Sequence, residues 1–156
     1  MTSVDSSFKV LLPYALKAIL NEDYSHIQQS KLISLPCTPT IRTILLNFSK
    51  THHDQESKNV VSDIIILFNV CVGLQLLYVQ ERKQYEDELA KQIPLCDIYG
   101  AVHLLRLIVK FPFFMQKSNL PDESVQKIKA VMNALISFME KHTNVLFNDV
   151  YNESEI

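Results

Sequence analysis

Glycine is almost missing from this chain: Gly73 and Gly100 are the only two glycines in 156 residues. Folds rich in β-sheet normally need several glycines, because tight turns and bulges use backbone conformations that other residues avoid. The scarcity therefore favours a helical fold. It also removes several enzyme motifs, since the GxxxxGK[ST] phosphate loop, the GxGxxG dinucleotide turn and the GxSxG nucleophile elbow all need glycines at fixed spacing.

Hydrophobic residues recur at helical spacing in three segments, which begin near Pro13, after Thr38-Pro39 and after Pro121. Thr38 and Pro39 are expected to be the N-cap and the first residue of the second helix. The stripes consist of Leu16, Ile19 and Leu20, then Ile41, Ile44, Leu45 and Phe48, and finally Val125, Ile128, Met132, Leu135 and Met139. Each segment is predicted to form an amphipathic helix.

The segments between these helices predict a simple organisation. Residues 32–36, LISLP, are expected to be extended, with a short β-hairpin near them, because the residue before a proline avoids the helical region. Residues 49–59 are polar and are predicted to be a surface loop. The chain is predicted to be mainly α. Because we find no repeat and no low-complexity linker, we predict one compact multi-helix domain over residues 8–151. The ends, residues 1–7 and 152–156, are predicted to be flexible.

The apolar run VVSDIIILFNVCVGLQLLYV, residues 60–79, is about long enough to span a bilayer. However, Asp63, Asn69 and Gln75 interrupt it, and polar groups inside a membrane are costly without partners. A central helix buried on nearly all sides explains the run better, so we expect no membrane association. We expect this helix to continue through QERKQYEDELAKQ, residues 80–92, where charged residues take over.

Composition narrows the classes of function. The net charge is −2 and Arg82-Lys83 is the largest basic block, so we expect no direct binding of DNA or RNA. The N-terminal sequence MTSVDSSFKV lacks the pattern of a secretory signal. The three cysteines, Cys37, Cys71 and Cys96, show no CxxC spacing and favour a reducing compartment, the cytoplasm or the nucleus.

No metal, cofactor or catalytic site is predicted from motifs. The five histidines form no HExxH motif and none is spaced from a cysteine as zinc ligands are. His52-His53-Asp54 is expected to be solvated loop rather than a chelating site. One enzymatic alternative stays open: a small hydrolase whose cysteine and histidine meet only in the fold. A homodimerisation module is a further alternative.

Two stripes of residues suggest binding surfaces. Tyr78, Glu81, Arg82 and Tyr85 are spaced i, i+3, i+4 and i+7, which would place them on one helix face. Tyrosine and arginine are enriched in protein contact surfaces, although a salt-bridged helix end with tyrosines over the core explains the pattern equally well.

The second stripe lies in YGAVHLLRLIVK, residues 99–110, where His103, Arg106 and Lys110 interrupt an apolar helix. These basic residues either contact a partner or form hydrogen bonds that fasten neighbouring helices. Periodicity alone does not decide between the two.

The same stretches carry a family resemblance. GLQLLYVQERKQY (73–85) followed by IYGAVHLLRLIVK (98–110) resembles the signature of the MRG domain, the mortality-factor-related module of chromatin adaptor proteins. LLPYALKAILNEDYSHIQQSKLISLP (11–36) resembles the opening helix of that family and its Leu-Pro turn. LPDESVQKIKAVMNALISFMEKHTNVLF (120–147) resembles its closing helix. The resemblance extends from about Phe8 to about Tyr151, nearly the whole chain.

The resemblance implies a mostly α-helical, non-enzymatic adaptor. Such domains recruit proteins in the nucleus, within histone acetyltransferase and Sin3-type histone deacetylase complexes. They present a shallow hydrophobic pocket to partner segments, some of which contain Phe-x-Leu-Pro. Carried over residue by residue, the implied pocket consists of Leu12, Leu20, Tyr24, Tyr78, Val109 and Lys110, with Glu81, Arg82, Tyr85, His103 and Arg106 as further contact or structural residues.

The chain also departs from the family pattern. Tyr24 stands where the family often has tryptophan, Asn21 replaces a usually apolar residue, and Lys110 stands where arginine is common. A smaller and wetter pocket follows from these changes. The sequence leaves open which complex and partner are bound, the oligomeric state, and whether a chromodomain, which many family members carry, precedes this module.

Overall fold

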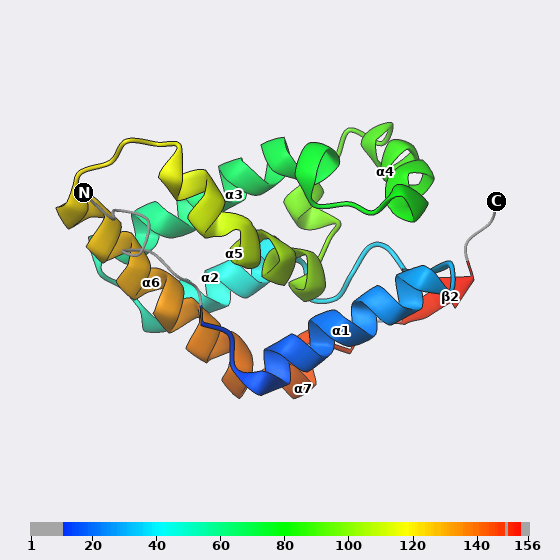
Figure 1. The fold of residues 1–156 in the computed structure, drawn as a ribbon, viewed down its shortest axis with the longest axis horizontal. Helices are drawn as coiled ribbons and strands as arrows, with labels where there is room; N and C mark the ends of the chain where they lie inside the picture. Colours follow the sequence, from blue (N-terminus) through cyan, green and yellow to red (C-terminus); the bar gives the residue numbers. More distant parts are fainter. Residues whose placement is uncertain (1–10, 149, 154–156) are drawn as a thin grey trace.

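The computed structural model describes residues 11–148 and 150–153, and most of these residues lie in helices. The predicted mainly α-helical class is therefore confirmed (Figure 1). The helices are α1 (Tyr14–Gln28), α2 (Ile41–Thr51), α3 (Gln55–Gln75), α4 (Arg82–Leu89), α5 (Ala101–Gln116), α6 (Asp122–Lys141) and α7 (Thr143–Leu146), with the short 3₁₀ helices η2 (Val79–Glu81) and η3 (Leu95–Asp97) and the strands β1 (Lys31–Ile33) and β2 (Tyr151–Glu153).

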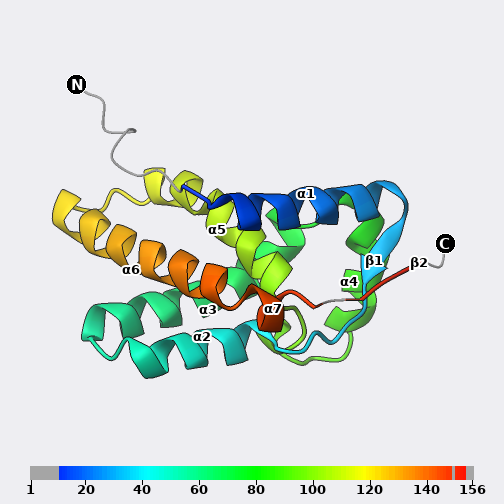
Figure 2. The ribbon, with the colours of Figure 1, turned by 90° about the horizontal axis from the view of Figure 1, so that it is seen from below.

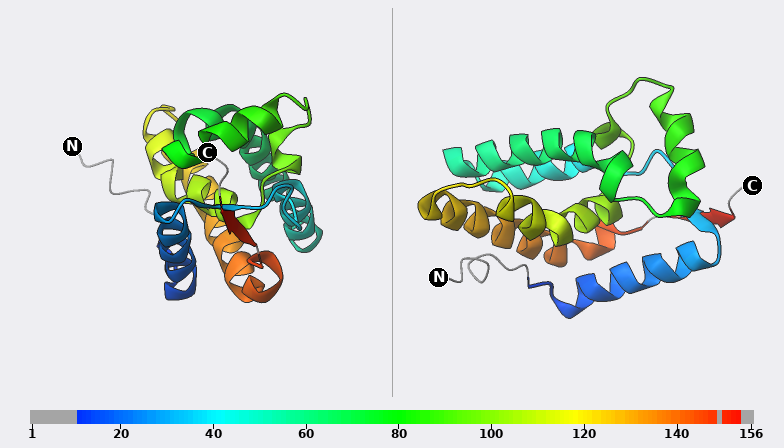
Figure 3. Two further views of the ribbon diagram at one scale, coloured as in Figure 1. Left: turned by 90° about the vertical axis from the view of Figure 1, so that its right-hand side faces the viewer. Right: turned by 45° about the horizontal axis from the view of Figure 1, so that its top comes forward.

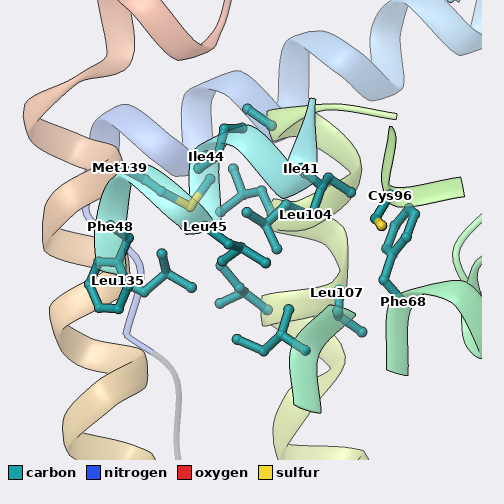
Figure 4. Close-up of a cluster of buried hydrophobic side chains, with 14 of the residues drawn as sticks. Ile41, Ile44, Leu45, Phe48, Phe68, Cys96, Leu104, Leu107, Leu135 and Met139 are labelled. Carbon is teal, nitrogen blue, oxygen red and sulfur yellow. The ribbon is translucent and has the colours of Figure 1, made fainter. Parts of the chain in front are cut away.

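The core forms where the predicted hydrophobic stripes meet. Helices α2, α3 and α6 run side by side, and α5 lies between this layer and α1 (Figure 2). The stripe of α2 is fully buried, as predicted, and packs against Leu104 and Leu107 of α5 and Leu135 and Met139 of α6 (Figure 4). Burying large aliphatic and aromatic side chains contributes about 1.5 to 3 kcal/mol for each side chain, so these stripes both define the helices and hold them together.

The helix boundaries around α2 differ from the sequence prediction. The N-cap is Thr40 rather than Thr38, because the Thr40 hydroxyl accepts the backbone N–H of Thr43. At the other end, α2 continues to Thr51 and α3 begins at Gln55, so the predicted loop 49–59 shrinks to residues 52–54. Asp54 caps α3 by accepting the N–H of Ser57 at 3.0 Å, which allows the helix to begin inside the polar stretch.

The strand predicted near residues 32–36 is present, and its partner comes from the far end of the described chain. β1 and β2 pair antiparallel, with Leu32 opposite Asn152. The small sheet lies at the end of α1, beside α4 (Figure 3). Residues 152 and 153, for which we predicted flexibility, belong to β2, while residues 1–7 and 154–156 lie outside the described residues.

Helix α3 corrects two predictions. It ends at Gln75 instead of continuing to residue 92. It is also not buried on nearly all sides: one face packs against α2 and α6, whereas Ile66, Val70 and Leu74 are exposed along the other. Within the described residues, α3 is the one helix long and apolar enough to cross a membrane, and 44% of its most apolar window is buried in this fold.

Candidate partner-binding pocket

The end of α3 organises the candidate site. The last carbonyls of a helix lack partners within the helix, and cations near them are favourable. Three basic side chains from later parts of the chain supply those partners. They are Arg82 on the Gly73 carbonyl, Lys110 on the Gln75 carbonyl at 2.8 Å and Arg106 on the Leu76 carbonyl at 2.9 Å. These long-range donors stabilise a helix end that local periodicity does not reveal.

The chain then turns sharply through residues 76–81, which separates residues that were predicted to share one helix face. Tyr78 lies in the turn, where its N–H donates to the Glu81 carboxylate at 2.9 Å. Glu81 itself is buried, Arg82 is exposed, and the Tyr85 ring packs against Gly73. The prediction of one continuous contact face is therefore wrong for this stretch.

A buried network of charges lies directly beneath this turn. The Arg106 guanidinium donates twice to Asp23 Oδ2, from Nε at 3.1 Å and Nη2 at 2.6 Å, and once to Glu81 Oε1 at 2.7 Å. His103 Nε2 lies 3.0 Å from Glu81 Oε2. Asp23, Glu81 and His103 are each 1% exposed, and Arg106 is 8% exposed. Buried charges of this kind are tolerated because they are paired and hydrogen-bonded.

The pKa values follow from these contacts. Burial by itself raises the pKa of the Glu81 carboxyl, but His103 and Arg106 outweigh burial and lower that pKa to about 2. Burial by itself lowers the pKa of the Arg106 guanidinium, but Glu81 and Asp23 raise it above its ordinary value. Glu81 and Arg106 are therefore both charged at physiological pH. For His103, the geometry supports the structural role over direct contact with a partner.

An open pocket of about 430 Å³ lies above the network. Its walls come from α1, from the end of α3 with the following turn, and from α5. The lining residues are Leu20, Asn21, Tyr24, Gln75, Leu76, Leu77, Tyr78, Arg106, Val109 and Lys110. Of the six residues assigned to the pocket from the resemblance, the structure brings five together around it, and Leu12 is absent from the lining because it packs against the main core.

Aromatic rings and a cation shape this pocket. The rings of Tyr24 and Tyr78 lie with centroids 5.6 Å apart, and the Arg106 guanidinium carbon lies 4.8 Å from the centre of the Tyr78 ring. Burial raises the pKa of the Tyr78 hydroxyl, so the hydroxyl stays neutral at physiological pH. Leu20 and Val109 add aliphatic walls. The pocket therefore suits an apolar side chain of a partner, with polar groups of the pocket at its edges.

Several residues of the site were missed by sequence reasoning. Gln75, Leu76 and Leu77 line the pocket only because α3 ends there. Asp23 had a detectable signal, since it occupies a core position of α1 between the buried residues Leu16 and Ile27. A carboxylate at such a position requires a buried partner.

A second, larger groove of about 610 Å³ lies between the small sheet and α4. Most of its lining residues are polar, including the exposed Lys83–Asp87 ion pair, but the surface that they present to the groove is mainly apolar, as it is in the pocket at the end of α3. None of the predicted pocket residues lines it, so its size alone does not make it the better candidate.

The cysteines bear on the hydrolase alternative. Cys37, Cys71 and Cys96 are all buried and none of the three forms a disulfide, and burial raises the pKa of Cys71 and Cys96. A nucleophilic thiolate needs access and a lowered pKa, so this alternative has no support. Within the described residues, no group of three or more His, Cys, Asp or Glu side chains could hold a metal ion.

A helical domain with an apolar surface pocket above a buried network of paired charges is built like a protein-interaction module. The chain matches the MRG family over residues 1–153. It is 36% identical over 145 residues to the NuA4 complex subunit EAF3 homolog of Dictyostelium discoideum, covering 90% of this chain and 38% of that protein. It is 32% identical over 151 residues to human Mortality factor 4-like protein 1, covering 90% of this chain and 42% of that protein.

The chain therefore belongs to the MRG family, as the resemblance predicted. Proteins of this family are chromatin adaptor subunits and not enzymes. The chain spans less than half the length of the two relatives described above.

Proposed function

We propose that this chain is a non-enzymatic adaptor domain of a chromatin-modifying complex in the nucleus. Its family membership supports this proposal, as does its 36% identity to a protein named as a NuA4 complex subunit. In this proposal, the domain recruits protein subunits and contributes no chemistry of its own. The partner complexes are histone acetyltransferase complexes of the NuA4 type, Sin3-type histone deacetylase complexes, or both.

The observation that carries the proposal is the pocket at the end of α3. Aromatic and aliphatic side chains from three separate parts of the chain converge there above the buried hydrogen bonds of Arg106. Interface anchors are usually apolar or aromatic side chains that enter such pockets, and tyrosine is common on the receiving surface. The exposed ammonium of Lys110 adds a polar edge. A partner segment with an aromatic and a leucine close together, such as Phe-x-Leu-Pro, fits this chemistry.

The proposal excludes direct nucleic-acid binding by this domain. The net charge of −2 supplies no electrostatic attraction for a phosphate backbone, which dominates such binding. Association with chromatin would therefore depend on protein partners.

The test uses a matched pair of valines. Val109 is 44% exposed and lines the pocket, whereas Val70 is 63% exposed on α3 and does not line it. Val109→Asp places an unpaired carboxylate where an apolar side chain of the partner must pack. We expect it to weaken binding of a labelled Phe-x-Leu-Pro peptide by about tenfold or more, equivalent to about 1.4 kcal/mol. Val70→Asp should bind like the unmodified chain.

Fluorescence polarisation measures the peptide affinity, and circular dichroism of both variants checks that they fold. Co-purification from nuclear extract tests whether the same substitution removes acetyltransferase or deacetylase subunits. Equal binding by both folded variants would place the partner surface elsewhere.

A further inference from the structure

A residue from the far end of the described chain also donates a hydrogen bond to the buried network beneath the pocket. Asp23 divides its two carboxylate oxygens between different donors: Oδ2 accepts both hydrogen bonds from Arg106, and Oδ1 accepts the Tyr151 hydroxyl at 2.6 Å. Tyr151 belongs to β2, and its ring stacks on His26 with centroids 4.0 Å apart. A hydroxyl 128 residues away in the sequence thus completes the coordination of Asp23.

The geometry points to Tyr151 as a positioning residue for the pocket, although it does not line the pocket itself. This inference rests on the proposed function of the pocket. The pathway has two hydrogen-bonded steps, from Tyr151 to Asp23 and from Asp23 to Arg106. Arg106 lines the pocket, lies against the Tyr78 ring and holds the Leu76 carbonyl.

Each step constrains the next because the groups are buried. Asp23 is 1% exposed, and its hydrogen bond with the half-buried Tyr151 hydroxyl lies at the edge of a small open pocket, so the hydroxyl stands between Oδ1 and solvent. A carboxylate oxygen left without a partner in such a site is costly, and the side chain rotates or admits water to recover one. Either response disturbs Oδ2, which orients the rigid planar fork of Arg106. Asp23 lies on α1 next to Tyr24, and its hydrogen bonds with Arg106 tie α1 to α5, so weakening them loosens the α1 wall of the pocket relative to the α5 wall.

The β1–β2 sheet then does more than join the two ends of the described chain, because it also positions the Tyr151 hydroxyl. Pairing of β2 with β1 holds Tyr151 over α1. Any event that separates β2 from β1 would therefore withdraw the hydroxyl from Asp23 and loosen the pocket, even though the sheet does not line it.

The test removes a single oxygen atom. Tyr151→Phe keeps the ring that stacks on His26 and removes the donor to Asp23. Tyr14→Phe is the matched control, because Tyr14 is the first residue of α1 and its side chain is 85% exposed. We expect Tyr151→Phe to weaken the Phe-x-Leu-Pro peptide by about threefold or more in fluorescence polarisation, equivalent to about 0.7 kcal/mol. Tyr14→Phe should leave the affinity unchanged.

A second readout follows the network without a ligand. In ¹⁵N-resolved NMR spectra, the exchange of the Arg106 Nε–H with solvent should accelerate in Tyr151→Phe and stay unchanged in Tyr14→Phe. The inference holds if affinity falls and Arg106 exchange rises together. It is overturned if Arg106 exchange is unchanged in Tyr151→Phe, whatever the affinity, or if exchange rises while the affinity of the folded variant stays the same.

The two proposals can fail separately. If the peptide binds neither the unmodified chain nor any variant, the Phe-x-Leu-Pro assignment fails, and the Arg106 exchange alone decides whether Tyr151 positions the network. If the peptide binds and Val109→Asp abolishes binding while Tyr151→Phe has no effect, the pocket assignment stands and the positioning role of Tyr151 is wrong.

Discussion

Replacing Arg106 by methionine tests whether the buried network stabilises the fold. The substitution keeps an unbranched side chain of similar reach but removes four hydrogen bonds: two to Asp23, one to Glu81 and one to the Leu76 carbonyl. It removes the guanidinium from two carboxylates that are each 1% exposed, Asp23 and Glu81, and Glu81 keeps only its side-chain contact with His103. Breaking a buried ion pair by removing one partner typically costs about 3 to 5 kcal/mol. We expect a loss of that size in the free energy of unfolding.

Lys110 on the same helix supplies the comparison. Its ammonium is exposed and donates to one backbone carbonyl, so Lys110→Ala should change the free energy of unfolding by less than about 0.5 kcal/mol. Urea titration followed by circular dichroism measures both variants. Combining Arg106→Met with Asp23→Asn and Glu81→Gln should recover part of the loss, because the orphaned charges disappear. A cost below about 1 kcal/mol for Arg106→Met would show that these charges are not buried as described.

Three further predictions follow from individual contacts. The pKa of Glu81 is lowered from 4.5 to about 2. The ionised carboxylate therefore contributes up to about 3 kcal/mol to the free energy of unfolding, and this contribution is present above pH 4.5 and lost as the pH falls towards 2. Urea titrations across this range should show the loss, and Glu81→Gln should reduce it. Gly73→Ala should destabilise the fold by about 1 to 3 kcal/mol, because an added Cβ would clash with the Tyr85 hydroxyl. Tyr85→Ala in the same chain should relieve that clash, and an additive loss would contradict it. Leu135→Ala, at a fully buried position of α6, should lower the free energy of unfolding by about 2 to 5 kcal/mol without changing peptide affinity in the folded variant.

Local periodicity determined much of the fold. The stripe Ile41, Ile44, Leu45 and Phe48 was assigned to a helix and is the buried face of α2. The stripe that follows Pro121 likewise became α6, with Met132, Leu135 and Met139 in the core. Such predictions succeed because a helix buries residues that are three and four positions apart, so the pattern of burial is written within a few turns of the chain.

The resemblance to the MRG family supplied the pocket residues that periodicity alone could not. Five of these residues meet around one depression, although they come from separate parts of the chain. The exception, Leu12, lies before the start of α1 and is partly buried against the core. A residue-by-residue transfer preserves the face of a helix, but it does not establish how far along the helix a pocket extends.

Tertiary contacts decided where α3 ends. An apolar run followed by charged residues predicted one helix through residue 92, because nothing within those residues stops it. The observed end at Gln75 is stabilised chiefly by the buried donor from Arg106, with Arg82 and the exposed Lys110 as further donors, and two of these three residues lie on α5. Local propensity is weak beside several hydrogen bonds to charged groups, so a distant helix overrides it.

The pairing of Asp23 with Arg106 and Tyr151 was equally beyond the sequence alone. These residues are separated by 83 and 128 positions, and no periodic pattern connects groups at such distances. The sequence determined which faces of the helices are apolar and which family the chain resembles. The tertiary structure decided which buried charges meet, because each finds its partner only after the helices have packed and water has been excluded.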